Sequence, residues 1–201
     1  KKGIASGAAS ADVEKLRRIV ESADRVLKFT RDLVTYARPA TEHPIPVCIH
    51  EILDQAVSFC EHVIEDTGAV VFKNYGAAST HVIGVKGQLV QVFVNLITNA
   101  CHAMPLGAGR LTLETLSAGD ERLVVRVVDN GRGIPEDNQA RIFEPFFTTK
   151  GEGKGTGLGL SIVKNLVEQH RGTIGITSEI GAGTVFEVNL ACRPDPQDSG
   201  A

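Results

Sequence analysis

Three side-chain amides within one very apolar stretch are the first candidates for ligand chemistry. Gln91, Asn95 and Asn99 stand four residues apart, so on a helix they project from one side. Amides are costly to bury without partners, so this row is either an internal hydrogen-bond network or the polar wall of a ligand site. A carboxamide oxygen is a hard, neutral ligand that suits Mg²⁺, which also takes phosphate oxygens.

A second polar group follows a run of alternating apolar residues. In VVRVVDNGRGIP, residues 124–135, Asp129 stands where a strand would end. Gly131 and Gly133 then allow a tight turn and let a flat ligand approach the backbone. The alternative interpretation is an ordinary strand-to-helix turn capped by Asp129.

The third feature is a run in which glycine occupies every second position from 151 to 159, between the apolar IFEPFF and a helix predicted from Leu158 to Val167. Backbone N–H groups at a glycine-rich helix N-terminus bind anions, and Lys150 and Lys154 add positive charge. The run matches neither the P-loop pattern nor a dinucleotide fingerprint that follows a strand. A plain linker is disfavoured, because IFEPFF needs a packing partner.

These groups must be positioned by helices and strands that lack a regular β-α-β alternation. We expect helices over 50–66, 88–104 and 156–170, and strands over 69–75, 81–85, 110–116, 122–129, 173–178 and 184–190. This order predicts an α+β fold, a two-layer sandwich of a mixed sheet with helices on one face.

Ahead of this domain, the sequence predicts one long helix over residues 12–40, which the prolines from Pro39 onward end. Apolar and small residues follow an unbroken heptad spacing, and a flanking row lies seven residues apart. The two rows of the heptad pattern and the flanking row make a wide apolar stripe, which suits a helix of a four-helix bundle. The alternative is a long core helix of a single domain. The heptad positions are Val13, Leu16, Val20, Ala23, Leu27, Thr30, Val34 and Ala37, and the flanking row is Ile19, Val26 and Leu33.

Composition excludes several classes of protein. The net charge of −3 offers no basic excess for nucleic acid. No apolar run is long enough to cross a membrane, and no signal peptide opens the chain. Four widely spaced cysteines fit a reducing cytoplasm, and the missing initiator methionine indicates a piece of a longer protein. We expect residues 1–11 to be a flexible lead and 192–201 a disordered tail.

Taken in order, the amide helix, the Asp-x-Gly-x-Gly turn, the aromatic segment and the glycine run resemble the ATP-binding domain of sensor histidine kinases. This is the GHKL superfamily with its Bergerat-type fold, and the resemblance covers about residues 46–191. The N box is similar to 91–104, the G1 box to 129–135, the F box to 142–150 and the G2 box to 151–160. The helix over 12–40 is similar to the second helix of the family's dimerisation and phosphotransfer bundle.

The resemblance implies a role for each matched residue. Asp129 would accept a hydrogen bond from the adenine amino group, and Asn99 would coordinate Mg²⁺ on the triphosphate of ATP. Asn95 and Lys150 would contribute to catalysis, and His102 stands where relatives often place a basic phosphate contact. The implied nucleotide-binding residues are Asn95, Asn99, His102, Asp129, Gly131, Gly133, Ile134, Phe143, Thr149, Lys150, Gly155, Thr156, Gly157, Leu158, Gly159 and Thr184.

One departure favours phosphotransfer to histidine over hydrolysis. Hydrolytic relatives carry a glutamate as general base four residues before the magnesium asparagine, where this chain has Asn95, which cannot accept a proton. The alternatives are a GHKL ATPase, a serine kinase of the anti-sigma type, or an ATP-sensing scaffold without activity. The predicted bundle helix argues against the serine kinase, and the intact boxes argue against the scaffold.

The family's acceptor histidine is commonly followed by an acidic residue, with proline five residues on. His50-Glu51 is followed by Gln55 instead, so we expect the acceptor to lie upstream of Lys1. The implied partners are the histidine-containing phosphotransfer helix of the same protein, a response regulator and a second copy in a homodimer. Because the fragment lacks this acceptor, we expect no autophosphorylation by the fragment alone.

Overall fold

A computed structural model of the chain describes residues 13, 15, 23, 43–119, 121–150 and 155–193. The predicted lead 1–11 and all but three residues of the predicted helix 12–40 lie outside the described residues. Those three, Val13, Lys15 and Ala23, are helical. Within the described part of the chain, no helix is both long and apolar enough to span a membrane.

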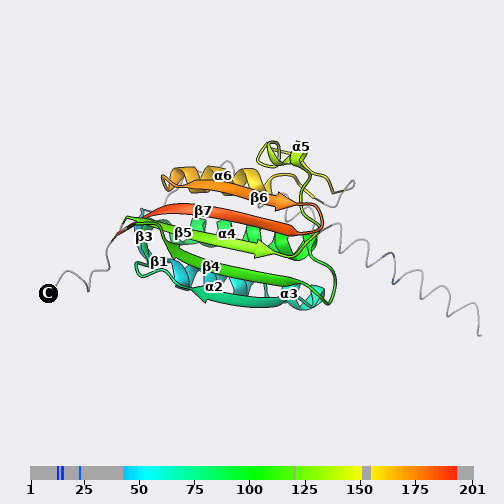
Figure 1. The fold of residues 1–201 in the computed structure, drawn as a ribbon, viewed down its shortest axis with the longest axis horizontal. Helices are drawn as coiled ribbons and strands as arrows, with labels where there is room; N and C mark the ends of the chain where they lie inside the picture. The colour runs from blue at the N-terminus through cyan, green and yellow to red at the C-terminus, as the bar shows by residue number, and fades with distance from the viewer. Residues whose placement is uncertain are drawn as a thin grey trace, which may run out of the picture.

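The described residues form one seven-stranded sheet in the order β1-β3-β7-β5-β4-β2, with β6 pairing the first part of β7 (Figure 1). The pair β2–β4 is parallel and the other pairs are antiparallel, so the sheet is mixed as predicted. The strands are β1 Ile45–Cys48, β2 Val70–Tyr75, β3 His81–Gly84, β4 Arg110–Ser117, β5 Arg122–Asp129, β6 Thr173–Glu179 and β7 Gly183–Arg193.

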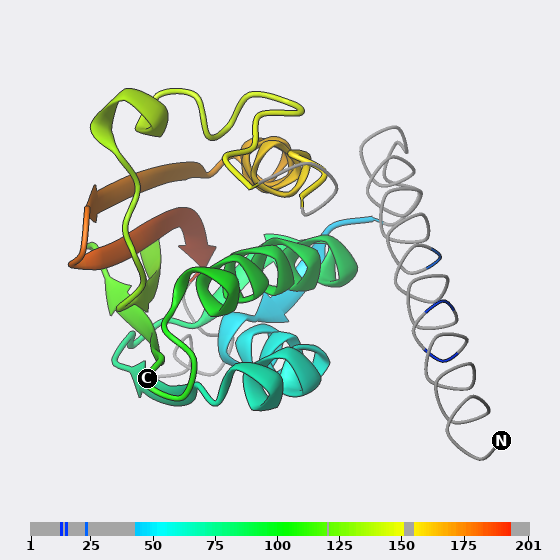
Figure 2. The same cartoon turned by 90° about the vertical axis from the view of Figure 1, so that its right-hand side faces the viewer.

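Helices cover one face of this sheet, which confirms the predicted two-layer α+β fold (Figure 2). The long helix α4 packs between α2 and α6. The helices are α2 Ile49–Phe59, α3 Glu61–Thr67, α4 Lys86–Ala103, α5 Glu136–Gln139 and α6 Gly159–Gln169.

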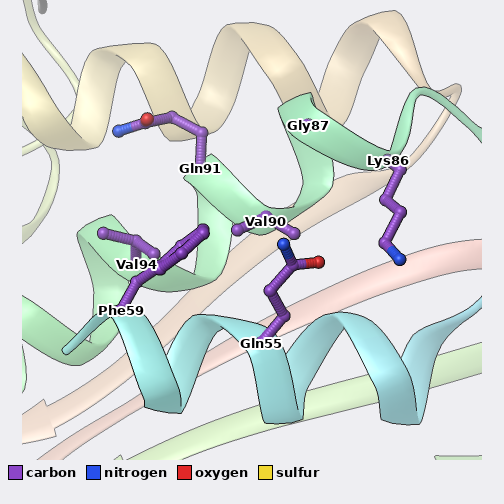
Figure 3. A pocket seen from close by; sticks show the side chains of 7 residues that line it. All are labelled: Gln55, Phe59, Lys86, Gly87, Val90, Gln91 and Val94. Atoms are coloured by element: carbon purple, nitrogen blue, oxygen red, sulfur yellow. The ribbon is translucent and has the colours of Figure 1, made fainter. Parts of the chain in front are cut away.

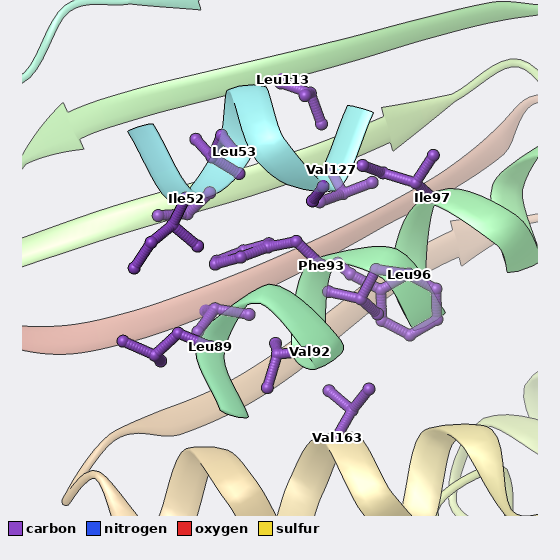
Figure 4. Close-up of a cluster of buried hydrophobic side chains, with 14 of the residues drawn as sticks. Ile52, Leu53, Leu89, Val92, Phe93, Leu96, Ile97, Leu113, Val127 and Val163 are labelled. Atoms are coloured by element: carbon purple, nitrogen blue, oxygen red, sulfur yellow. The ribbon is translucent and has the colours of Figure 1, made fainter. Parts of the chain in front are cut away.

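The core lies between α4 and the inward face of the sheet (Figure 4). Phe93 and Leu96 of α4 are fully buried, and they face Leu113 of β4 and Val127 of β5 in the same cluster. Burying each side chain of this size contributes about 1.5–3 kcal/mol. Since α4 carries eight buried residues, its position is held firmly, and so are the amides on its other side.

The structure corrects several predicted boundaries. The helix expected over 50–66 divides at Cys60, whose backbone φ of −97° and ψ of 1° are not helical. The helix expected from Thr156 begins at Gly159, because Gly157 has a φ of +67° that no helix accommodates. The tail was expected to begin at residue 192, but β7 continues to Arg193. The Cys192 N–H donates a hydrogen bond to the Glu121 carbonyl (2.9 Å).

Strand β1 was not predicted, because Pro46 lies within it. Proline is tolerated on an edge strand, where its missing N–H faces away from the ladder. Strand β1 is such an edge, since it pairs with β3 alone.

His50 belongs to a polar cluster that joins α2 to β2 and β4. Its ring stacks on Tyr75 with centroids 4.4 Å apart, and its Nε2 lies 2.9 Å from Oγ1 of the buried Thr115. Asp54 accepts hydrogen bonds from Tyr75 Oη (2.9 Å) and Lys73 Nζ (2.7 Å). His50 is therefore engaged within the fold, which fits its rejection as the phosphoryl acceptor.

We expect His50 to make the domain less stable in mild acid. Burial lowers the pKa of His50 below its usual value of about 6.5, with Asp54 opposing the effect. The unfolded chain therefore takes up a proton first as the pH falls from about 7, and the folded state loses stability through that window. Urea unfolding of His50→Gln should show a flatter dependence between about pH 7 and pH 5 than the wild-type chain.

His62→Gln is the matched control, because the side chain of His62 is 90% exposed. If His50→Gln and His62→Gln flatten the profile equally, the buried cluster is not the source of the acid sensitivity.

Candidate nucleotide site

The floor of the candidate site is Asp129, the last residue of β5. Strand alternation places it on the same face as Val125 and Val127, toward the helices. Only 4% of Asp129 is exposed, and its Oδ1 accepts a hydrogen bond from the Gly131 N–H (2.8 Å). Burial raises the pKa of Asp129, while backbone N–H donors at Gly131 and Thr184 oppose the rise. The site thus offers a buried acceptor at its floor.

The turn after β5 has no room for side chains. A Cβ on Gly131 would lie 2.6 Å from Asp129 Oδ1 and 2.8 Å from the Ala103 carbonyl oxygen. Gly133 has a φ of +72°, and a Cβ there would collide with the Glu179 carbonyl in the β6–β7 hairpin. The Arg132 N–H donates to the Ala103 carbonyl (3.1 Å), which ties this turn to the end of α4.

A small hydroxyl network supports the turn from behind. Ser178 Oγ accepts from the Ile134 N–H (2.9 Å) and donates to the Gly183 carbonyl (2.9 Å). Because a hydroxyl has one proton, Thr184 must donate in its 2.9 Å hydrogen bond to Ser178. The Thr184 oxygen therefore keeps acceptor capacity on the pocket side. Sequence reasoning missed Ser178, since no motif marks it.

The amide row of α4 forms an internal hydrogen-bond network and also lines a cavity. Gln91 Nε2 donates to Asn95 Oδ1 (3.1 Å), and Asn95 Nδ2 donates to the carbonyl of Gly159 at the start of α6 (3.3 Å). All three amides also line one cavity. The Asn99 side chain makes no hydrogen bond to any described residue, which leaves its oxygen available to a ligand.

The opposite wall of the site comes from the segment on either side of the glycine run. Lys150 Nζ lies 3.4 Å from His102 Nδ1, which brings two basic groups together from positions 48 residues apart. The Phe146 N–H donates to the Gly157 carbonyl (2.9 Å), so the two ends of the segment are joined. Gly151, Gly153 and Lys154 lie outside the described residues.

These groups surround one cavity of about 940 Å³, which falls within the usual size of a small-molecule site. Of the residues expected at the site, those that line the cavity are Asn95, Asn99, His102, Asp129, Gly133, Ile134, Thr149, Lys150, Gly155, Thr156, Gly157, Gly159 and Thr184.

Gly131, Phe143 and Leu158 do not line the cavity. Gly131 is buried against the Asp129 carboxylate. Leu158 is buried in the core, and Phe143 packs edge-on against Phe186 with ring centroids 6.5 Å apart. All three support the cavity from outside its surface.

Several lining residues were missed by sequence reasoning. Thr98 and Ala103 follow from the helical spacing of the amide row, and Arg132 and Thr148 lie inside the segments 129–135 and 142–150 that the sequence analysis had singled out. Ile180 and Phe186 come from the last hairpin, which no local pattern ties to the site. The complete missed set is Val94, Thr98, Ala100, Ala103, Arg132, Pro135, Asn138, Ile142, Phe147, Thr148, Leu160, Ile180 and Phe186.

A metal at this site would need a bound ligand to complete its coordination. Within 43–119, 121–150 and 155–193, no group of three or more His, Cys, Asp or Glu residues could hold a metal ion. A single amide oxygen from Asn99 suits Mg²⁺, which usually keeps several waters and takes phosphate oxygens. The donor set thus fits a magnesium ion that arrives with a nucleotide.

Comparison with known proteins agrees with this geometry. Residues 84–194 match the family model described as histidine kinase-, DNA gyrase B-, and HSP90-like ATPase. The chain is 37% identical over 190 residues to the sensor kinase CckA of Brucella abortus, which covers 87% of this chain and 20% of that protein. It is 32% identical over 208 residues to the sensory histidine kinase/phosphatase NtrB of Rhodobacter capsulatus, which covers 95% of this chain and 56% of that protein.

A solved structure matches over most of the chain. Full-length ShkA in complex with AMPPNP superposes with a TM-score of 0.75 and 30% sequence identity, covering 88% of this chain and 38% of that one. The chain therefore spans only part of the length of each of these relatives.

Proposed function

This chain belongs to the family of histidine kinase-, DNA gyrase B- and HSP90-like ATPases, and we propose that it is the ATP-binding catalytic part of a sensor histidine kinase. The observation that carries the proposal is the buried carboxylate of Asp129 at the floor of a cavity that Lys150 and His102 also line. The AMPPNP complex of the similar protein ShkA supports a nucleotide as the ligand.

In the proposed pose, the adenine amino group donates to Asp129, and the Thr184 hydroxyl accepts from a water molecule beside it. The triphosphate extends along α4 toward Lys150, and Asn99 Oδ1 is the protein ligand for Mg²⁺. The metal would neutralise charge on the phosphate oxygens. Each of these contacts uses a group that lines the cavity.

The proposed reaction is transfer of the γ-phosphoryl group to a histidine. A neutral imidazole nitrogen bonds to the γ-phosphorus while the bond to the β,γ-bridging oxygen breaks, and ADP leaves. Such a step depends mainly on positioning and charge neutralisation, to which Lys150 contributes. Asn95 cannot take a proton from water, and its amide is held between Gln91 and Gly159, so it serves as a positioning group.

We further propose that the acceptor lies on a phosphotransfer helix of the same protein, that two copies form a homodimer, and that a response-regulator aspartate takes the phosphoryl group. A cytoplasmic location is part of this proposal, since ATP and the regulator are found there. Mixing this chain with labelled ATP and a separate acceptor-histidine fragment should label the fragment with an acid-labile phosphoryl group. ATP binding without transfer would contradict the kinase assignment.

We expect Asn99→Ala to remove most of the effect of Mg²⁺ on ATP binding. In titration calorimetry, Mg²⁺ should tighten ATP binding to the wild-type chain about tenfold and to Asn99→Ala hardly at all. Asn165→Ala is the control, because Asn165 lies on α6 outside the cavity and its side-chain oxygen accepts a hydrogen bond from Gln169 Nε2 (2.8 Å). An unchanged Mg²⁺ effect in Asn99→Ala would remove Asn99 as the metal ligand.

A further inference from the structure

Arg132 lines the nucleotide cavity, and none of the contacts proposed above uses its side chain. The residue is exposed, and no residue in the described part of the chain forms a hydrogen bond or ion pair with its guanidinium group. By contrast, Arg126 donates to Glu187 (2.9 Å) and Arg141 donates to Glu144 (3.3 Å). The five N–H donors and the flat face of the Arg132 guanidinium are therefore available to a ligand.

The backbone of Arg132 is held on both sides. Its N–H donates to the carbonyl of Ala103, the last residue of α4 (3.1 Å), and its own carbonyl accepts from the Gly181 N–H (2.9 Å). Strand β5 ends beside this β6–β7 hairpin, because Asp129 pairs with Thr184 (Figure 1). Arg132 is thus anchored where the end of α4 meets the hairpin, at the rim of the cavity.

This part of the rim lies at the base end of the proposed nucleotide pose. Arg132 follows Asp129 by three residues, and its N–H is bonded to the C-terminal end of α4. Asn99 and Asn95 stand about 6 and 12 Å back from Ala103 along the helix, toward Gly159. The triphosphate would therefore lead away from Arg132.

The guanidinium does not pair with the carboxylate at the floor of the site. An ion pair with arginine would hold the pKa of a carboxyl below its usual value. Burial instead raises the pKa of Asp129, and only backbone N–H groups, at Gly131 and Thr184, oppose the rise. The Arg132 side chain therefore leaves Asp129 as an unneutralised acceptor for the ligand.

The surface next to Arg132 has room for a flat ligand. The neighbouring residue of α4 is Ala103, whose methyl group fills little of the cavity. The neighbouring residue of the hairpin is Ile180, which also lines the cavity and is 69% exposed. A guanidinium group is planar and stacks on aromatic rings, so it suits the face of a purine better than a compact ammonium group does.

We propose that Arg132 binds the nucleotide by stacking its guanidinium plane on the adenine ring, while Asp129 accepts from the amino group at the ring's edge. The inference rests on the proposed function, since it takes ATP as the ligand of the cavity. It assigns Arg132 to the base, whereas Lys150 acts on the phosphates.

Affinities for ATP and for adenosine test this assignment, because the two ligands share the base and differ in the phosphates. Titration calorimetry gives the ATP affinity, and competition with ATP gives the adenosine affinity. Arg132→Ala should weaken the binding of both ligands by the same factor, about tenfold. Arg122→Ala is the matched control, because Arg122 is an exposed arginine of β5 that does not line the cavity.

Arg132→Lys keeps the positive charge and removes the flat group, so it should bind both ligands about as weakly as Arg132→Ala. Urea unfolding of both variants should match the wild-type chain, since no described residue pairs with the Arg132 side chain.

Three results would overturn the assignment while leaving ATP as the ligand. They are equal affinities of Arg132→Ala and Arg122→Ala, a loss confined to ATP, which would place Arg132 on the phosphates, and wild-type affinity in Arg132→Lys. A wild-type chain that binds no ATP would contradict the proposed function itself, and this inference with it.

Discussion

Replacing Asp129 with asparagine should weaken ATP binding about 100-fold without lowering the free energy of unfolding of the ligand-free domain. The asparagine oxygen can still accept from the Gly131 and Thr184 N–H groups, as the carboxylate does. Its amide nitrogen would then face the adenine amino group, so two donors would meet in a buried site. The loss of a buried charge offsets any weakening of the backbone hydrogen bonds.

Asp137→Asn is the matched control, because Asp137 is exposed on α5 and does not line the cavity. Titration calorimetry gives the ATP affinity, and urea unfolding gives the stability. Equal ATP affinities of Asp129→Asn and Asp137→Asn would remove Asp129 from the base-binding role. A large fall in stability of Asp129→Asn would mean that the carboxylate is structural.

The same carboxylate predicts a pH dependence with a defined sign. Burial raises the pKa of Asp129 in the folded state above its usual value of about 3.9. As the pH falls through the folded pKa, the carboxyl takes up a proton in the folded state before it does so in the unfolded chain. Protonation of Asp129 therefore stabilises the folded state in acid. The same protonation removes the carboxylate that would accept the hydrogen bond from adenine, so ATP binding should weaken as the pH falls.

Replacing Gly133 with alanine should damage both stability and nucleotide binding. Its φ of +72° is unfavourable for alanine, and the added Cβ would collide with the Glu179 carbonyl. Neither of these backbone segments can yield easily, because the Gly181 N–H donates to the Arg132 carbonyl across the contact (2.9 Å). We expect a loss of more than about 3 kcal/mol in the free energy of unfolding, and ATP affinity lowered by at least about tenfold.

Gly181→Ala separates the backbone cost from the collision. Gly181 lies in the neighbouring hairpin with a φ of +81°, and nothing lies within 4 Å of a Cβ built there. Its substitution should lower the free energy of unfolding by only about 1–2 kcal/mol, because alanine is less stable than glycine in a left-handed backbone conformation. If the two variants lose equal stability, the close approach of the turn to the β6–β7 hairpin does not constrain Gly133.

The two faces of α4 explain how a single helix serves both the fold and the site. Its buried residues pack on the sheet, and its amides line the cavity. A smaller hollow between α2 and the first half of α4 (Figure 3) shares Gln91 and Val94 with this cavity. Any contact that moves the first half of α4 would therefore act directly on the wall of the nucleotide site.

Local sequence patterns predicted most of the helices and strands, because an element with one buried face shows a periodic spacing of apolar residues in its sequence. The alternation in β5 marked its inward face and placed Asp129 at its end, and the four-residue spacing placed Gln91, Asn95 and Asn99 on one side of α4. Patterns failed where tertiary context overrides local preference. Pro46 concealed an edge strand, and Cys60 divides a stretch whose apolar spacing is continuous.

The sequence by itself determined which chemical groups the site contains, since amides, a carboxylate, glycines and lysines occur in a fixed order along the chain. Only the tertiary structure decided which of them meet. Lys150 reaches His102, and the Ile180 hairpin closes over Gly133, because the sheet and the helix layer bring distant segments together. Such pairings depend on packing between elements far apart in the chain, and no local pattern records them.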